Sequence, residues 1–197
     1  MELKKENLEF AELLIEEMGK ILVEKQPRLE SFLYNTAKVR QHLMKESDRG
    51  CVILAVSYLE SILSDLLKGK LIGSKKHFKD LFDFNGPLGS FSGKIKMAYS
   101  IGVITEQEKT DINNIRALRN IFAHSHHSIT LEDKAPKAIV DKLKIDLRIR
   151  ENDTPRRKFI SVTWYIISML GINSDLEKFK YNRTEEPIIL SEQKEKY

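Results

Sequence analysis

Cysteine and long apolar runs are what this 197-residue sequence has least of. Its single cysteine, Cys51, excludes an internal disulfide framework and a zinc site built on cysteines, and it fits a reducing compartment. The most apolar stretch, residues 159–172, is interrupted by two serines and a threonine and is shorter than the roughly 18 residues of a membrane span. The N-terminus carries no visible secretory signal. We therefore expect a cytoplasmic protein without a membrane segment, in which residues 159–172 form a buried core helix.

The chain also lacks a strong excess of positive or negative charge. The chain has 33 Lys and Arg against 29 Asp and Glu, which gives a formal charge of +4. Residues 133–160 alone hold nine basic and five acidic residues, an excess as large as that of the whole chain. Such a segment can contact nucleic acid, and it can equally be a solvated face. The charge of the chain therefore does not indicate which class of partner it binds.

What the sequence does have is helical periodicity, because apolar residues recur at spacings of three, four and seven. The predicted helices cover residues 2–25, 27–45, 48–67, 75–82, 94–101, 105–122 and 154–171. Their starts and ends are marked by Ser47, Thr105 with Glu108, Thr154 with Pro155, Gly102 and Gly171. Apolar and charged residues alternate as in a strand within 143–149. We expect an all-α bundle of about seven helices, with a possible short β segment near 143–149.

Two segments stand apart from the predicted helices. Residues 84–93 contain three glycines and Pro87 but also large apolar side chains, so we expect an ordered loop with Leu88 and Phe91 packed inward, near the helix that carries His124. The loop lacks the lysine and serine of a phosphate-binding loop. We place residues 1–180 in one domain and expect 181–197 to be a flexible or partner-bound tail.

The residues that best suit chemistry gather in one helix end. Arg116, Asn120 and His124 are four residues apart and share one stripe of a helix, whereas Arg119 lies about 140° round from His124. Histidine can act as a general acid or base near neutral pH, and a guanidinium group can stabilise a phosphorane, so the set suits phosphodiester cleavage. The structural alternative is an ordinary polar helix end in which Arg119 pairs with Glu60 or Asp65.

Histidines follow at positions 126 and 127, and they raise the question of a metal. Spacings of two and one from His124 do not form a compact helical ligand pair, and no cysteine assists. We predict neither a metal site nor a cofactor.

Three separated motifs resemble the mannitol operon repressor family. They are Glu46-Ser47-Asp48-Arg49-Gly50-Cys51, the segment from Asn85 to Ile95, and Ile115-Arg116 followed by Arg119-Asn120-Ile121-Phe122-Ala123-His124-Ser125. The resemblance covers about residues 40–126. It implies an all-helical, bacterial, cytoplasmic protein that represses a sugar-alcohol operon through a protein partner, because the family lacks a conventional DNA-binding fold. No helix-turn-helix is visible in this sequence either.

The string Arg119-Asn120-x-x-x-His124 is also similar to the motif of the HEPN superfamily. Many of its members are dimeric, metal-independent endoribonucleases, and others are inactive binding scaffolds. The resemblance implies that Arg119 stabilises the scissile phosphate, Asn120 positions it and His124 is the acid or base. On one straight helix Arg119 does not reach His124. In a homodimer the second copy would supply this partner.

Two hypotheses follow. The first is a homodimeric transcriptional regulator that acts through a protein partner, and the alternative is a HEPN-type endoribonuclease whose substrate is RNA. Arg119, Asn120 and His124 are catalytic only under the alternative. We place the remaining binding residues at Arg116, Arg49, Ser125 and His126.

Overall fold

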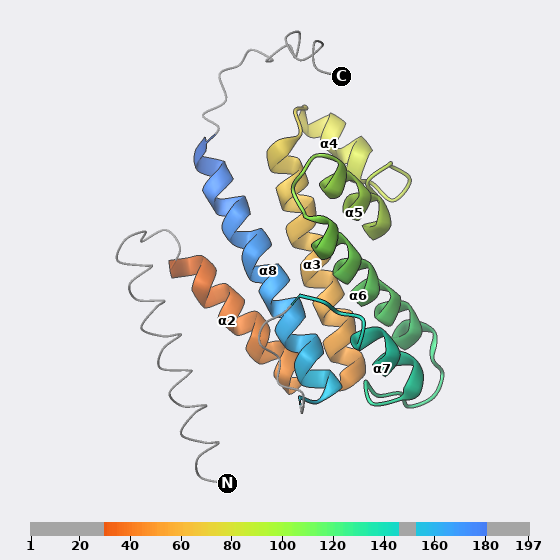
Figure 1. Ribbon diagram of the computed structural model, residues 1–197. Coiled ribbons are helices and arrows are strands. Elements are labelled where there is room, and N and C mark those ends of the chain that lie inside the picture. Colours follow the sequence, from red (N-terminus) through yellow and green to blue (C-terminus); the bar gives the residue numbers. More distant parts are fainter. Residues whose placement is uncertain (1–29, 146–152, 181–197) are drawn as a thin grey trace.

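The computed structural model describes residues 30–145 and 153–180, with side chains described from 36 to 145 and from 153 to 171, and these parts form a bundle of α-helices (Figure 1). The helices are α2 (Glu30–Lys45), α3 (Asp48–Lys70), α4 (Lys75–Phe82), α5 (Phe91–Ser100), α6 (Glu106–His124), α7 (Lys134–Val140) and α8 (Pro155–Lys180). No strand occurs in the described ranges. The expected all-α fold is confirmed, while the predicted first helix and residues 146–149 of the proposed β segment lie outside the described ranges.

Helix α3 is the centre of the bundle. It packs against α2, α5, α6 and α8, and its fully buried side chains include Cys51, Leu59, Leu63 and Leu67. By length and composition α3 could cross a membrane. Its burial among four neighbouring helices is instead the packing of a core helix, as its all-round apolar sequence predicts.

The two longest of the described helices run side by side in the same direction. Helix α8 begins beside the start of α3, where Arg156 pairs with Asp48, and Figure 1 shows both helices running to the opposite end of the bundle. About half of the side chains described in α8 are buried, and Phe159 and Ile166 are fully buried. The prediction of a buried core helix in this region is confirmed for residues 159–171.

Local capping sets most helix starts. The Ser47 side chain accepts a hydrogen bond from the Gly50 amide at 3.1 Å, and Thr105 forms a capping box with Glu108. Gly102 has a φ of 70°, as its predicted place after a helix requires. These starts and this stop are confirmed.

Three helix predictions differ from the structure. Helix α5 begins at Phe91, ahead of the predicted residue 94, because Ser90 caps it by accepting from the Gly93 amide at 3.0 Å. Helix α7 is missing from the prediction, because seven residues are too few for a periodic signal. Helix α8 continues through Gly171 to Lys180, since tertiary packing of this buried glycine outweighs its weak helix propensity.

The glycine-rich loop between α4 and α5 packs inward as expected, but it does not lie beside His124. Leu88 and Phe91 are buried, and a Cβ atom on Gly86 or Gly89 would collide with backbone carbonyl groups of residues 80–84. Glycine is therefore needed for close approach of the chain. Figure 1 places this loop at the end of the bundle away from the last turn of α6, so it does not wall the residues around His124.

Candidate functional site at the end of helix α6

The last two turns of α6 present three polar side chains to solvent. Arg119, Asn120 and His124 are exposed, whereas Leu118 and Phe122 on the same turns are fully buried and anchor the helix in the core. Arg119 donates to the Asn120 side-chain oxygen at 3.5 Å, a long and weak hydrogen bond. Across the described part of the chain, no hydrogen bond or ion pair is seen for the His124 side chain. The side chains predicted to be catalytic are therefore accessible.

The chain that follows α6 is held by Arg49. Its guanidinium group donates to the backbone carbonyls of Ser125 at 2.8 Å and His127 at 3.0 Å, and the Ser125 hydroxyl donates to the same His127 carbonyl at 3.1 Å. His126 and His127 remain exposed. Arg49 and Ser125, which the sequence suggests as binding residues, thus share in fixing the position of the histidines.

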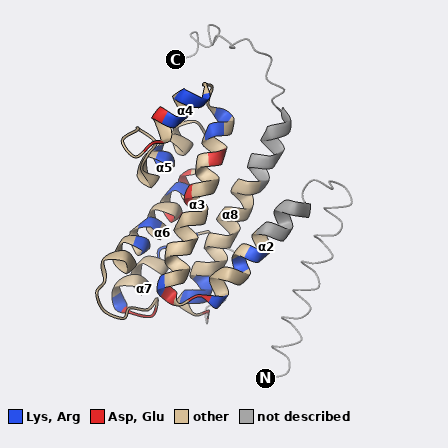
Figure 2. Ribbon diagram, turned by 180° about the vertical axis from the view of Figure 1, so that it is seen from behind, with Lys and Arg blue, Asp and Glu red and all other residues tan. Residues whose placement is uncertain are grey.

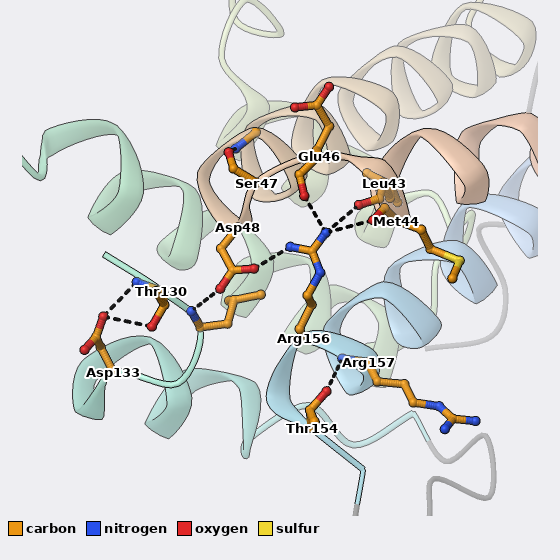
Figure 3. Close-up of polar contacts among 12 residues, drawn as sticks. Leu43, Met44, Glu46, Ser47, Asp48, Thr130, Asp133, Thr154, Arg156 and Arg157 are labelled. Atoms are coloured by element: carbon orange, nitrogen blue, oxygen red, sulfur yellow. Dashed lines mark hydrogen bonds and ion pairs between the residues drawn. The ribbon is translucent and has the colours of Figure 1, made fainter. Parts of the chain in front are cut away.

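Asp48 and Arg156 form the junction below this segment (Figure 3). One Asp48 carboxylate oxygen accepts from the Leu131 amide at 2.7 Å, and the other pairs with Arg156. Arg156 also donates to the carbonyls of Leu43 at 3.0 Å and Glu46 at 2.6 Å. One ion pair therefore joins the end of α2, the start of α3, the segment after α6 and the start of α8, and we call this the arginine end of the bundle.

The reason for this network is electrostatic. A cation in the first turn of a helix is unfavourable because the N-terminus carries partial positive charge, yet α8 opens with Arg156, Arg157 and Lys158. Asp48 compensates Arg156, and the last carbonyls of α2 lack partners within their own helix. Sequence reasoning missed Arg156, although a basic run directly after Thr154 and Pro155 was the available signal.

Two further acidic side chains, Glu60 and Asp111, form structural contacts. Glu60 accepts a hydrogen bond from Lys94 at 2.7 Å, so the suggested pairing of Glu60 with Arg119 is wrong. Asp111 is fully buried and accepts from the backbone amides of Lys144 and Ile145 at distances of 2.9 to 3.1 Å. It thereby fixes the chain after α7.

Arg116 differs from the exposed residues of the same stripe. Its side chain is half-buried, and its Nε atom is buried with no hydrogen-bond partner among the residues described. A buried donor without a partner costs stability unless a bound group satisfies it. Arg116 therefore shares the stripe of Asn120 and His124, as the sequence predicts, but its Nε atom is covered by the surrounding residues.

Within one chain, Arg119 and His124 remain apart. Helix α6 is continuous through His124, so the two side chains project about 140° apart around the helix axis. The described residues contain no group of three side chains able to hold a metal ion. A single copy therefore offers an accessible cationic and imidazole-bearing surface, which we call the α6 surface: Arg116, Arg119, Asn120, His124, His126 and His127.

Together these features define an all-helical protein with an exposed polar surface at one end of its bundle, held in place by the half-buried Asp48–Arg156 ion pair and the hydrogen bonds of Arg49. The chain belongs to the mannitol repressor family, MtlR, whose family model matches residues 22–158. That range holds α2 to α7 and the start of α8. The family resemblance of the three sequence motifs is confirmed.

The fold is similar to that of a solved structure. It is a chain in the X-ray structure of the MtlR-HPr complex from Escherichia coli, with a TM-score of 0.52 and 19% sequence identity. The similarity covers 72% of this chain and 96% of that one. No curated protein matches the chain in sequence. The HEPN resemblance stays a prediction.

Proposed function

We propose that the chain is a cytoplasmic regulator that modulates transcription of a sugar-alcohol operon by binding a protein partner. Membership of the mannitol repressor family supports the regulatory role. The similar fold in a complex of MtlR with HPr supports a protein as the partner, and we take an HPr protein from the same organism as the first candidate.

The proposal rests on one observation, namely that the α6 surface presents accessible side chains on a fixed backbone. Apart from the half-buried Arg116, its charged and imidazole side chains are exposed, while their backbone is fixed by Arg49, Asp48 and Arg156. A rigid backbone with accessible donors loses little entropy on binding, which favours recognition of a partner. Because Arg119 is cationic, the complementary surface of the partner is expected to be acidic or rich in acceptors.

Calorimetric titration of the full chain with the HPr protein tests this. We expect binding that weakens with added salt, and a loss of affinity of about tenfold or more in Arg119→Glu, because a charge reversal at an interface introduces repulsion. Lys96→Glu is the matched control, since Lys96 is equally exposed but lies on α5. Equal affinity of all three proteins would remove the α6 surface from the interface.

The second candidate function is metal-independent cleavage of RNA by a homodimer. It is favoured by one observation, namely that the Arg119, Asn120 and His124 side chains are all exposed and make no described contact outside α6. In such a site His124 would transfer the proton of the attacking or leaving oxygen, and Arg119 of the second copy would stabilise the charge on phosphorus.

Incubation of the full chain with structured RNA in EDTA tests the second candidate. We expect cleavage to be lost in His124→Ala and retained in His77→Ala, a control at another exposed histidine. If each site combines two copies, mixing Arg119→Ala with His124→Ala subunits restores part of the activity. Cleavage that survives His124→Ala would exclude the assigned mechanism.

A further inference from the structure

Helix α4 is packed unlike the other described helices. It is the only one with side chains described throughout that buries none of them, and its contacts with the other described helices are few. Its apolar residues Phe78, Leu81 and Phe82 form one stripe at spacings of three and four, and all three are only half-buried. Phe82 packs against the core, so the part of the stripe that remains half-covered is that of Phe78 and Leu81.

Exposed apolar residues lie at both ends of α4. Ile72, just before the helix, is 74% exposed, and Phe84, just after it, is 93% exposed. Isolated exposed apolar side chains are normal, but a contiguous set on a half-covered amphipathic helix marks an interaction site. We define the α4 surface as Ile72, Phe78, Leu81 and Phe84 with the exposed lysines Lys75, Lys76 and Lys79.

The charge around this surface is positive. Residues 68–83 contain five lysines and two aspartates, and Figure 2 shows the blue residues gathered on α4 and the adjoining end of α3. Lys68 lies over the Phe82 ring, 5.3 Å from its centre. An occupant of this surface is therefore expected to combine apolar side chains with carboxylates.

The sequence contains such a segment. Residues 185–192 read Glu185-Glu186-Pro187-Ile188-Ile189-Leu190-Ser191-Glu192, in which three glutamates flank three consecutive large apolar residues and no basic residue occurs. Both the apolar run and the charge complement the α4 surface.

The end of α8 brings this segment within reach. Helices α3 and α8 begin together at Asp48 and Arg156 and have 23 and 26 residues, so at 1.5 Å per residue they end at nearly the same height. Helix α4 follows α3 after a four-residue connection. The eight residues that follow Lys180, up to Ile188, can span about 26 Å, more than twice the roughly 8 to 10 Å between packed helices.

We propose that residues 185–192 dock on the α4 surface of the same molecule, with Ile188 to Leu190 covering Phe78, Leu81 and Phe84 and the glutamates facing the lysines. The occupant is thus a segment of this chain, and the α4 surface is distinct from the α6 surface at the other end of the bundle (Figure 1).

A nitroxide spin label on the full chain tests the proposal. Ser191→Cys provides one accessible attachment point, because the native Cys51 is fully buried. We expect the label to broaden the backbone amide signals of residues 75–84, and expect this broadening to fall sharply in Phe84→Ser. Because a tethered label also visits α4 by chance, this difference between variants is the deciding quantity. Met44→Ser is the matched control, an exposed apolar residue at the arginine end.

Charge reversal gives an independent readout. Glu185→Lys combined with Glu186→Lys, or Lys75→Glu combined with Lys76→Glu, is expected to reduce the broadening, and all four changes together are expected to restore it. Broadening that is the same in Phe84→Ser as in the unsubstituted protein would overturn the proposal. Equal broadening when labelled protein is mixed with an unlabelled isotope-enriched chain would overturn docking within one molecule, because it would show that the segment binds a second copy.

Discussion

Arg156 carries more of the polar structure than any other single side chain described. It pairs with Asp48 and donates to carbonyls at the end of α2. Its side chain is 28% exposed and that of Asp48 is 18% exposed, so water compensates little when either is removed. We expect Arg156→Ala to lower the free energy of unfolding by about 2 to 3 kcal/mol, because it leaves a half-buried carboxylate and several carbonyls without partners.

Urea denaturation of the full chain measures this effect, and the adjacent arginine supplies the control. Arg157 is 58% exposed on the same helix and forms an ion pair with Asp153 at 3.3 Å. The Asp153 side chain is only 12% exposed, but an ion pair whose cation is so exposed contributes little. Arg157→Ala should therefore change the free energy of unfolding by less than about 1 kcal/mol. Equal losses in the two variants would show that the Asp48 junction is not structural.

His124 illustrates the opposite case. It is exposed, makes no described contact outside its helix, and is the last residue of α6. We expect His124→Ala to change the free energy of unfolding by at most about 0.5 kcal/mol. Phe122, two residues earlier, is fully buried. Phe122→Ala should therefore lower the free energy of unfolding by about 3 to 5 kcal/mol. Thermal unfolding of both variants checks this, and a loss of several kcal/mol for His124→Ala would make it a structural residue.

Cys51 should give the protein a pH dependence in the alkaline range. Burial raises the pKa of its thiol from 9.0 to about 12, although the nearby Arg156 charge opposes part of the rise. Because the unfolded chain then releases the thiol proton more readily than the folded protein, this contribution to stability is complete below pH 9 and is lost as the pH rises toward 12. Between pH 8 and pH 10 the loss should be about 1 kcal/mol.

The comparison with Cys51→Ala isolates this effect from other groups that titrate at high pH. Urea denaturation at pH 8 and pH 10 should show a larger fall in the unsubstituted protein than in the variant. In the native state the thiol should also resist thiol reagents at pH 8 and react quickly in urea. Rapid native-state labelling would contradict the burial of Cys51.

At the scale of elements, the α4–α5 loop depends on glycine for close approach. A Cβ atom on Gly89 would meet the backbone of Asp83 and Phe84, whereas one on Gly69, within α3, would meet nothing within 4 Å. We expect Gly89→Ala to destabilise the protein by about 1 to 3 kcal/mol and Gly69→Ala to stabilise it by up to about 1 kcal/mol. Thermal unfolding midpoints should move in opposite directions, and a parallel shift would contradict the packing of the loop.

Helix boundaries were predictable where a residue's own side chain sets them. The Thr105 and Glu108 capping box is a local event, so its sequence pattern and its structure coincide. Gly171 shows the limit, because its effect on α8 depends on neighbours that are distant in sequence. Helix α7 was not predicted for a related reason. Its Pro136 and Val140 are buried by tertiary contacts, which a pattern of seven residues does not reveal.

The candidate site was predictable only in part. The exposed residues Arg119, Asn120 and His124 follow from the helical pattern and the motif they form. The bonds from Arg49 to the carbonyls of residues 125 and 127 span more than 70 residues of sequence, and no local pattern reports such a contact. The motif that contains Arg49 was visible, but its role in supporting the α6 surface required the fold.

At the scale of the whole molecule, the bundle separates two surfaces. The arginine end carries the α6 surface on a backbone fixed by Asp48, Arg49 and Arg156, and the other end carries the half-covered helix α4 (Figure 1). The central helix α3 joins them with a core of fully buried side chains. This arrangement suits a protein in which one end binds a partner while the other can be occupied independently.

The most direct test of the proposed function is therefore to locate the partner on the full chain. An isotope-enriched protein should be titrated with the HPr protein while its backbone amide signals are recorded. We expect the shifts to concentrate at residues 116–127 and to disappear in Arg119→Glu, with α4 unaffected. Absence of shifts at partner concentrations well above those of the protein, or shifts confined to residues 72–84, would contradict it.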